Sequence, residues 1–387
     1  MEFGIWNLEL ACPAKRGNLE LGTWTLVYYY PVLLLSMTIN ELLKLAIERQ
    51  ASDLHIVAGY SPSIRVHRQM YHLTNIDPLT GAQTKDLLLP LLNTVQKQRL
   101  QETLEHDCSI VDTSGVRFRA NFYYQKGSLA ATFRHINDKI RTVEELMLPH
   151  IFHQFIKHPY GLVLFTGPTG EGKSTSLAAL IQEINQTYTK HVVTIEDPIE
   201  YVFPIGKSVI SQREISFDTL TWTNALRASL RQDPDVIFVG EMRDYETISS
   251  ALTAAETGHL VFSTLHTSSS VEAISRIVDV FPPHQQTQVR TQLASMLRVV
   301  VTQRLLPSTS SQNPMIPSVE ILQNTSAVAA IIREGKFFML DSVLETGDQF
   351  GMILMEKYLG KLIRDGLITK EVAAQNCIRP HLLTKYL

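Results

Sequence analysis

The feature that most constrains this chain is an eight-residue pattern, G-x-x-x-x-G-K-S, at positions 167–174. It follows an apolar run at 162–165 and precedes the stretch Ser-Leu-Ala-Ala-Leu-Ile, which is typical of a turn between a strand and a helix. These flanks argue against a chance glycine-rich turn. The pattern therefore predicts a phosphate-binding loop, and with it a nucleotide-binding protein.

The chemistry of this loop is local. Glycines let successive backbone N–H groups converge on phosphate oxygens, Lys173 supplies a positive charge, and the Ser174 hydroxyl can ligate Mg²⁺. A helix that starts near Ser174 adds its positive end. Glu171 is unusual because it places a carboxylate in a loop built for anions, and we expect its side chain to point to solvent. The residues assigned to the nucleotide are Gly167, Pro168, Thr169, Gly170, Glu171, Gly172, Lys173, Ser174 and Thr175.

Composition narrows the class of protein. A chain of 387 residues is long for one domain, so two folded units are expected, and its 44% hydrophobic content is enough for sizeable cores. The formal net charge of −3 argues against the broad basic face that a sequence-independent nucleic-acid binder needs. Cys12, Cys108 and Cys377 lie far apart and form no CxxC pair, so they predict neither a disulfide framework nor a zinc site. A reducing, cytoplasmic location fits this cysteine usage.

The first 36 residues need separate treatment. Residues 23–37 are apolar and follow two basic residues, but the run is short for a membrane span and no small-residue cleavage site follows it. Thr38 and Glu41 form the capping box of an amphipathic helix directly after Met37. We therefore expect residues 1–36 to be an N-terminal extension upstream of a start at Met37.

The remaining chain divides into three parts. Residues 37–136 predict a small α+β domain with helices near 39–47 and 84–104 and strands at 54–57, 63–67, 108–112, 116–124 and 130–136. Residues 137–160 predict a connector with a helix over 143–157. In residues 161–387, strands at 162–166, 191–196, 236–239 and 260–265 alternate with helices, which is typical of a doubly wound α/β core. From residue 279 onward the pattern predicts mainly helix.

Charged side chains stand where three of these core strands end. The second core strand runs into an acidic stretch at 194–200, the third ends at Glu241, and the fourth ends at His266. Each alone is more typical of a helix cap, a solvated turn or a structural histidine. In an open α/β sheet, however, ligands bind outside the carboxyl ends of the strands. Together, in this order after a phosphate-binding loop, they favour nucleotide hydrolysis.

In these segments the chain resembles the secretion ATPase superfamily, which drives type IV pili and type II secretion. The boxes of that family are readable as Walker A at 167–174, the Asp box at 194–201, Walker B at 236–243 and the His box at 258–267. The resemblance runs from about Met37 to the C-terminus. It implies a RecA-like P-loop ATPase core with a smaller, PAS-like N-terminal α+β domain, and ATP and Mg²⁺ as cofactors.

The resemblance is strongest to the PilT-like members that retract pili and drive twitching motility. Their C-terminal segment is similar to AIRNLIREGK, and residues 327–336 read AVAAIIREGK here. The difference falls at Ala329 and Ala330, where the family has Arg-Asn. Assembly and secretion members usually carry a tetracysteine metal module, which three scattered cysteines cannot build.

The resemblance also implies roles for individual residues. Lys173 and Ser174 would contact phosphate and Mg²⁺, Glu196 would be the general base, and Glu241 would hold Mg²⁺ through water. Which glutamate has which role stays open. His266 matches the γ-phosphate sensor, and His259 in the same box is the weaker candidate.

Oligomeric partners follow from the same resemblance. The family works as a homohexamer in which the small domain of one subunit closes over the nucleotide of the next, so Arg119 or Arg134 would stabilise the transferring phosphoryl group in trans. Alternatively, Arg117 and Arg119 only face solvent along a half-buried strand. The expected location is cytoplasmic and peripheral to the membrane, at the inner face near the pilus base, where an inner-membrane platform protein is the partner and no nucleic acid is stably bound.

Three other functions remain open from sequence alone. A pilus assembly or type II secretion ATPase would share the core. A nucleic-acid translocase is disfavoured by the charge and by the absence of an aromatic and basic track in the sequence. Measurable turnover would exclude a nucleotide switch that does not hydrolyse.

Overall fold

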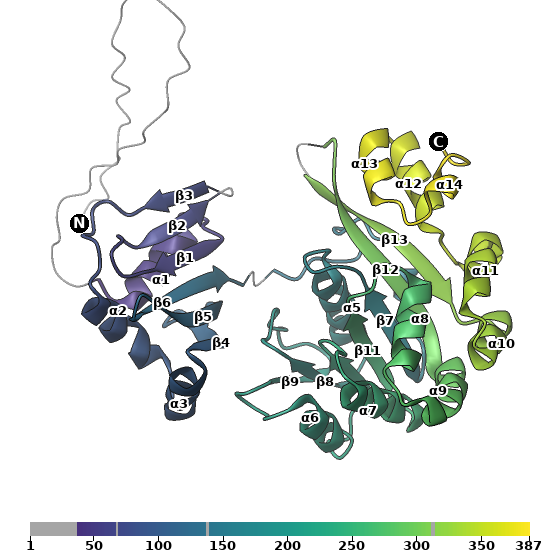
Figure 1. Ribbon diagram of the computed structural model, residues 1–387, viewed down its shortest axis with the longest axis horizontal. Helices are drawn as coiled ribbons and strands as arrows, with labels where there is room; N and C mark the ends of the chain where they lie inside the picture. The colour runs from purple at the N-terminus through teal and green to yellow at the C-terminus, as the bar shows by residue number, and fades with distance from the viewer. Residues whose placement is uncertain (1–36, 67–68, 137–138, 311–313) are drawn as a thin grey trace, which may run out of the picture. The chain divides into compact units, whose positions relative to one another are not determined.

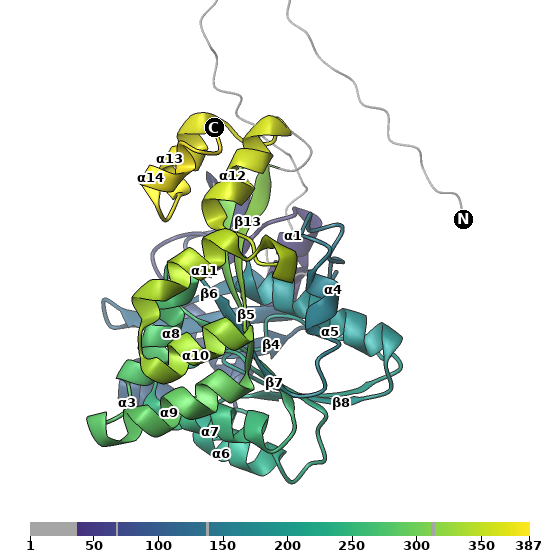
Figure 2. The same ribbon diagram turned by 90° about the vertical axis from the view of Figure 1, so that its right-hand side faces the viewer.

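The computed structural model describes residues 37–66, 69–136, 139–310 and 314–387 (Figures 1 and 2). The expectations for residues 1–36 lie outside this range. The predicted first helix is confirmed as α1 (Ile39–Glu48), with the capping box in place: Glu41 N–H donates to the Thr38 hydroxyl, and the Glu41 carboxylate accepts from Thr38 N–H at 2.7 Å. Among the described helices, none combines the length and apolar character needed to cross a bilayer.

In the described part of the N-terminal domain, an antiparallel sheet has the strand order β3-β2-β1-β6-β5-β4. Burial alternates along β4 and β5, as strands with one solvated face require. The predicted helix over 84–104 is divided by Pro90 into α2 and α3, and Asn93 caps the second piece. The elements are β1 (Asp53–Ile56), β2 (Ser63–Val66), β3 (Gln69–His72), α2 (Gly81–Leu88), a 3₁₀ turn (Leu89–Leu91), α3 (Thr94–Thr103), β4 (Glu105–Val111), β5 (Arg117–Gln125) and β6 (Ser128–His135).

A second sheet carries the strand order β13-β12-β7-β11-β10-β8-β9 and confirms the expected α/β core. All of its described pairings are parallel except that of β12 with β13. The strands are β7 (Gly161–Thr166), β8 (His191–Glu196), β9 (Val209–Glu214), β10 (Val236–Val239), β11 (Leu260–Leu265), β12 (Leu297–Pro307) and β13 (Met315–Gln323).

Helices cover both faces of this sheet, and β7 shows how. Its side chains alternate between two cores: Leu162 and Leu164 pack on one face, and Val163 and Phe165 on the other. The helix α5 (Lys173–Thr187) packs on the second face. The helices of the first face are α6 (Trp222–Ser229), α7 (Tyr245–Glu256), α8 (Ser270–Asp279) and α9 (Pro283–Met296). The sheet is therefore doubly wound, and its apolar strands read as continuous runs because both faces are buried.

The expectation of a mainly helical C-terminal third is wrong for residues 297–307 and 315–323. These form the long strands β12 and β13, whose buried residues on both faces give no alternation to read. The β-branched run 299–301 is the local cause of the strand. Helices follow only after it: α10 (Ser326–Glu334), α11 (Leu340–Thr346), α12 (Met355–Arg364), α13 (Lys370–Asn376) and α14 (Pro380–Leu383).

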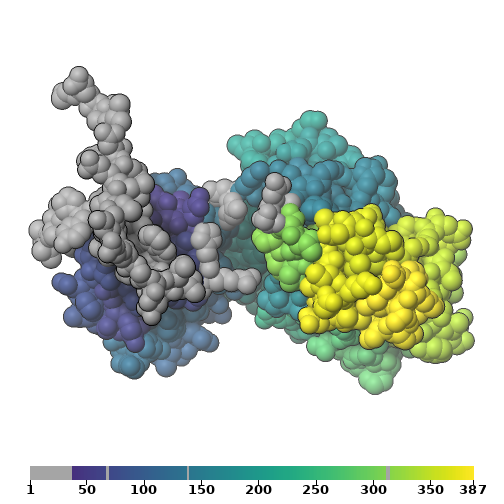
Figure 3. Space-filling model, turned by 90° about the horizontal axis from the view of Figure 1, so that it is seen from above, coloured from purple at the N-terminus to yellow at the C-terminus, as the bar shows by residue number. Residues whose placement is uncertain are grey.

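The C-terminal helices are fixed to the sheet by a buried ion cluster. The Arg379 guanidinium donates to Glu320 on β13 at 2.7 Å and to Glu356 on α12 at 3.4 Å. It also pairs with Asp341 on α11. Both Glu320 and Glu356 are fully buried, so they need this partner. The outer surface of these last helices forms a continuous patch in the space-filling view (yellow, Figure 3).

The predicted helix over 143–157 is much shorter in the structure. Only α4 (Phe152–Phe155) forms, because Met147 adopts a left-handed φ of 57° and Pro149 follows it. Phe152 and Phe155 are fully buried and lie in the same core as Phe165 of β7. This segment is therefore packed onto the mainly parallel sheet as a series of turns.

Candidate active site

The phosphate-binding loop follows β7 and ends where α5 begins. Gly167 has a φ of +143°, and a Cβ at this position would lie 2.4 Å from the carbonyl oxygen of Gln303 on β12. Gly172 has a φ of +77° and is the residue before the first turn of α5. Only glycine adopts these conformations without strain. The predicted order of strand, loop and helix is confirmed.

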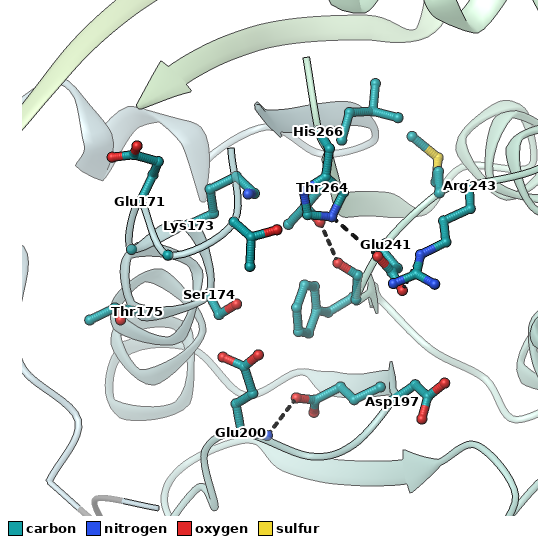
Figure 4. Close-up of a pocket in the computed structure, with 18 of the residues that line it drawn as sticks. Glu171, Lys173, Ser174, Thr175, Asp197, Glu200, Glu241, Arg243, Thr264 and His266 are labelled. Atoms are coloured by element: carbon teal, nitrogen blue, oxygen red, sulfur yellow. Dashed lines mark hydrogen bonds and ion pairs between the residues drawn. The ribbon is translucent and has the colours of Figure 1, made fainter. Parts of the chain in front are cut away.

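Lys173 opens α5 and is buried inside the loop. Its ammonium group donates to the carbonyl oxygens of Gly167 at 2.7 Å and Pro168 at 2.8 Å. Burial lowers the pKa of Lys173, although three nearby carboxylates act in the opposite direction. Figure 4 shows the Ser174 side chain facing Glu200 across the same space. A cation and a hydroxyl thus stand at the positive end of α5, where phosphate binds.

Glu171 does not point to solvent as expected. Its carboxylate accepts a short hydrogen bond from the N–H of Leu305, and its carbonyl oxygen accepts one from the Gln303 side chain at 2.7 Å. The strand β12 pairs with β7 only as far as Thr302, which lies opposite Thr166. Beyond this pair, the Glu171 carboxylate accepts the Leu305 N–H in place of a neighbouring strand. Figure 4 places this carboxylate on the opposite side of the loop from Glu241 and His266. Its charge is therefore directed away from the phosphate side.

The strand register brings the other predicted side chains to the same edge of the sheet. Thr166 of β7 lies opposite Leu265 of β11, and Val239 of β10 lies between Ser263 and Ile195. The residues that follow or end these strands therefore converge outside their carboxyl ends. They line one cleft, in which Figure 4 shows most of them: Lys173, Ser174, Glu196, Glu200, Glu241, Arg243, Thr264 and His266.

Glu196, the last residue of β8, is the most buried acid of this cleft. Its carboxylate accepts hydrogen bonds from the Thr194 hydroxyl at 2.7 Å, from the Gln212 side chain at 3.3 Å and from Glu200 N–H at 3.4 Å. Burial raises the pKa of Glu196 to about 7, although these three hydrogen bonds act to lower it. A carboxyl group that titrates near neutral pH suits proton transfer.

Glu241, just beyond β10, contacts two basic side chains. It accepts from Arg243 Nε at 2.7 Å and lies 3.2 Å from His266 Nε2. Thr264 at the end of β11 donates to the carbonyl oxygen of Gly240 at 2.6 Å and so fixes the backbone beside this acid. Glu241 and His266, which the sequence assigned to the site separately, are thus in direct contact.

His259 lies away from this pair. It precedes β11 whereas His266 follows it, so the two histidines stand at opposite ends of one strand. The His259 ring contacts Ala254 and Thr257 near the end of α7. These contacts favour a structural histidine.

The two predicted arginines are neighbours in the N-terminal sheet. Arg119 of β5 lies directly opposite Arg134 of β6. Arg134 Nε donates to the buried carboxylate of Asp53 at 2.9 Å. Arg134 therefore has a role in the fold of its own domain, and a substitution at Arg119 is the cleaner test of catalysis.

Two residues at the site were not singled out from the sequence. Gln303 donates to Glu171 O and accepts from the Ser176 hydroxyl at 2.8 Å, so its side chain links the loop to α5. The available signal was a polar pair, Thr302 and Gln303, inside an apolar strand. Arg243 lies within the 236–243 box but was given no role.

Acidic and basic side chains on successive strand ends of a doubly wound sheet, beside a glycine loop that opens a helix, are the arrangement of a RecA-like P-loop ATPase. The fold and site place this chain in that class. More specifically, the chain belongs to the type II/IV secretion system protein family, whose sequence profile matches residues 33–335.

Similarity to individual proteins supports this family assignment. The chain is 43% identical to the type IV pilus retraction ATPase PilT of Pseudomonas aeruginosa, over 89% of this chain and 99% of that protein. It is 46% identical to a twitching motility protein of Neisseria gonorrhoeae, over 83% of this chain and 86% of that protein. Its fold is similar to a crystal structure of the pilus retraction motor PilT with bound ADP: the TM-score is 0.84 at 43% identity, with 90% of this chain and all of that chain covered. The resemblance found from the sequence is confirmed.

The contact between Glu171 and Leu305 leads to a first prediction. Glu171→Ala removes a charged acceptor from a backbone N–H and should cost about 2 kcal/mol of unfolding free energy. It should also weaken ADP binding, because the loop loses one of its two hydrogen bonds to β12. Glu171→Gln, which keeps an acceptor oxygen, should retain most of both. Chemical denaturation and ADP titration would measure this, and an Ala variant as stable as the parent would contradict it.

Proposed function

We propose that this protein is a cytoplasmic motor ATPase that powers type IV pilus retraction, and so twitching motility, by Mg²⁺-dependent hydrolysis of ATP. The observation that carries the proposal is the convergence of the phosphate-binding loop with Glu196, Glu241 and His266 at one sheet edge. The full-length similarity to retraction and twitching proteins supports the biological assignment.

The phosphates of ATP would lie on the loop and the first turn of α5. The donor set also fits Mg²⁺, since the Ser174 hydroxyl and the Glu241 carboxylate are hard oxygen ligands on facing sides of the cleft. Ser174 would hold the ion directly, and Glu241 would hold it through water. Bound there, Mg²⁺ would neutralise phosphate charge during transfer. Lys173 would turn from the loop carbonyls to the phosphates.

Hydrolysis requires a water molecule in line with the γ-phosphorus. We assign Glu196 as the base that takes the proton of this water while its oxygen attacks phosphorus and ADP departs. The pKa of about 7 supports this assignment, because such a group is both present as carboxylate and basic enough at neutral pH. His266, in contact with Glu241, would sense the γ-phosphate.

The base of the nucleotide would occupy a second cavity of about 310 Å³ beside the loop. Gly172 and Thr175 form one wall of this cavity, and Leu146, Met147 and Pro317 give it apolar surface. A flat, partly apolar ring suits such a lining. The turns of residues 141–147 would thus contact the nucleotide directly.

The ring assembly is the remaining part of the proposal. We infer a homohexamer at the inner face of the cell membrane, in which Arg119, and less directly Arg134, acts on the nucleotide of the neighbouring subunit. Nucleotide state would then change the angle between domains through the 137–160 connector and move an inner-membrane platform protein. The net charge of −3 supports a protein partner over a nucleic-acid track.

The pH dependence of turnover tests the role of Glu196. A base with a raised pKa is protonated below that pKa and active above it, so kcat/KM should rise with pH and reach half its maximum near pH 7. Glu196→Gln should lower the rate by at least about 100-fold and abolish this rise of kcat/KM with pH. If kcat/KM of Glu196→Gln still rises with pH in the same range, the titrating group is ATP or another residue. That result would contradict the assignment of Glu196 as the base.

Subunit mixing tests the action of arginine in trans. Lys173→Ala and Arg119→Ala should each lower turnover by about 1000-fold or more. Mixed rings contain interfaces that pair an intact Lys173 with an intact Arg119 from the neighbour, so mixing two inactive proteins should restore part of the activity. Arg119→Lys is the matched control, because lysine keeps the positive charge but lacks the planar, forked guanidinium group. No recovery on mixing, with assembly intact, would contradict a role in trans.

Deleting the gene tests the direction of movement. If the motor retracts pili, its loss leaves assembly unopposed, so cells should carry more surface pili and lose twitching motility. Complementation with the Lys173→Ala chain should fail to reverse the change. Fewer pili than in the parent strain would indicate an assembly ATPase instead.

A further inference from the structure

A cluster of imidazole and carboxylate groups stands on the segment before β7, apart from the catalytic side chains. Within the described residues, ligand atoms of Glu144, His150 and His153 all lie within 4.8 Å of one another. Glu144 Oε1 is 2.8 Å from His153 Nε2, and the two histidine rings are 4.7 Å apart between centroids. Three side chains thus direct donor atoms at one small space.

A fourth residue orients the cluster from behind. The carboxylate of Glu183 on α5 lies 2.8 Å from His153 Nδ1 and is mostly buried. Both ring nitrogens of His153 face a carboxylate, Nδ1 that of Glu183 and Nε2 that of Glu144. When Nδ1–H stays on Glu183 and Nε2 loses its proton to solvent, Nε2 becomes an acceptor that can bind a metal ion. This carboxylate and histidine arrangement is the one that fixes the tautomer and orientation of metal-binding histidines.

Hydrogen bonds and buried side chains hold the backbone that carries these ligands. Turns are closed by hydrogen bonds from Met147 N–H to Glu144 O at 2.9 Å and from His153 N–H to His150 O at 3.2 Å. Leu148 and Phe152 bury their side chains in the core beneath, which fixes the backbone of the ligands and leaves the exposed side chains free to adjust. A preformed site loses little chain entropy on binding.

We propose that Glu144, His150 and His153 form a binding site for a divalent transition-metal ion of the zinc type, with Glu183 as the residue that positions His153. Two imidazole nitrogens and one carboxylate oxygen are ligands for Zn²⁺, Co²⁺ or Ni²⁺, whereas Mg²⁺ and Ca²⁺ prefer oxygen alone. Water would complete the coordination.

The geometry requires only small movements. Ligands at about 2.0–2.1 Å from a tetrahedral ion lie about 3.4 Å from each other. The Glu144 to His153 pair at 2.8 Å would open slightly, and the other atoms would close in from at most 4.8 Å. Glu144 and His150 are exposed, so both can make this adjustment and the ion can enter from solvent.

An ion at this site would stabilise the contact between the turns of residues 144–153 and α5. The ligands belong to the turns of residues 144–153, and Glu183 belongs to α5, whose first turn carries Lys173 and Ser174. Without an ion, His153 can form an ion pair with both carboxylates and hold the same elements less firmly. This simpler arrangement is the alternative that the experiment must exclude.

The test uses the full-length protein, stripped of metal with a chelator and transferred to chelator-free buffer without nucleotide. Titration with Co²⁺ should produce visible absorption bands with one ion per chain, and Zn²⁺ should displace it. Calorimetry with Zn²⁺ gives the affinity. Histidine ligands must be deprotonated, so binding should weaken at acidic pH and release protons.

Variants separate this site from incidental binding. His150→Ala should lower Zn²⁺ affinity more than about 100-fold, and Glu183→Gln about 10-fold to 100-fold. His284→Ala, which removes an exposed histidine on α9, should have no effect. His150 is exposed, so its variant should keep the parental Tm in chelator. Should it unfold, Glu144→Gln replaces it.

Two results would overturn the proposal. One is the absence of micromolar Co²⁺ or Zn²⁺ binding by the parent protein. The other is parental affinity in both His150→Ala and Glu144→Gln, which would place the ion elsewhere and leave His153 as an ion-pair residue only.

Discussion

The close approach of the phosphate-binding loop to β12 is the constraint on which the rest of the site depends. The carbonyl oxygen of Gln303 occupies the space that any side chain at position 167 would need, so only glycine fits at this position. The Gln303 side chain then holds both Glu171 O and the Ser176 hydroxyl. One buried residue thereby sets the position of the loop and of α5, and through α5 that of Lys173.

The proposed catalytic site depends equally on the register of a parallel sheet. Each strand contributes one functional end, and none of these ends is near the others in sequence. Burial then differentiates the acids: Glu196 lies beneath the surface among neutral hydrogen-bond donors, whereas Glu241 is paired with Arg243 and His266. Two glutamates of the same chemistry thus stand in different surroundings, and burial raises the pKa of Glu196 to about 7.

Local sequence patterns predicted the elements whose signals are local. The capping box gave α1, and the apolar runs gave β7, β8, β10 and β11. The same approach failed for β12 and β13, since strands buried on both faces lose the alternation that distinguishes them from helices. It also extended α4 too far, because a single left-handed residue at Met147 is not visible in hydrophobic periodicity.

The sequence by itself determined the chemistry: a glycine loop with Lys173 and Ser174, acids and a histidine after successive strands, and a family whose motifs occur in this order. Only the tertiary structure decided how these groups are used. It turned Glu171 away from the phosphate toward β12, raised the pKa of Glu196 by burial, and set His153 between two carboxylates. The reason is physical, since residue types and short-range periodicity are encoded locally, whereas burial and hydrogen-bond partners arise from segments far apart in the chain.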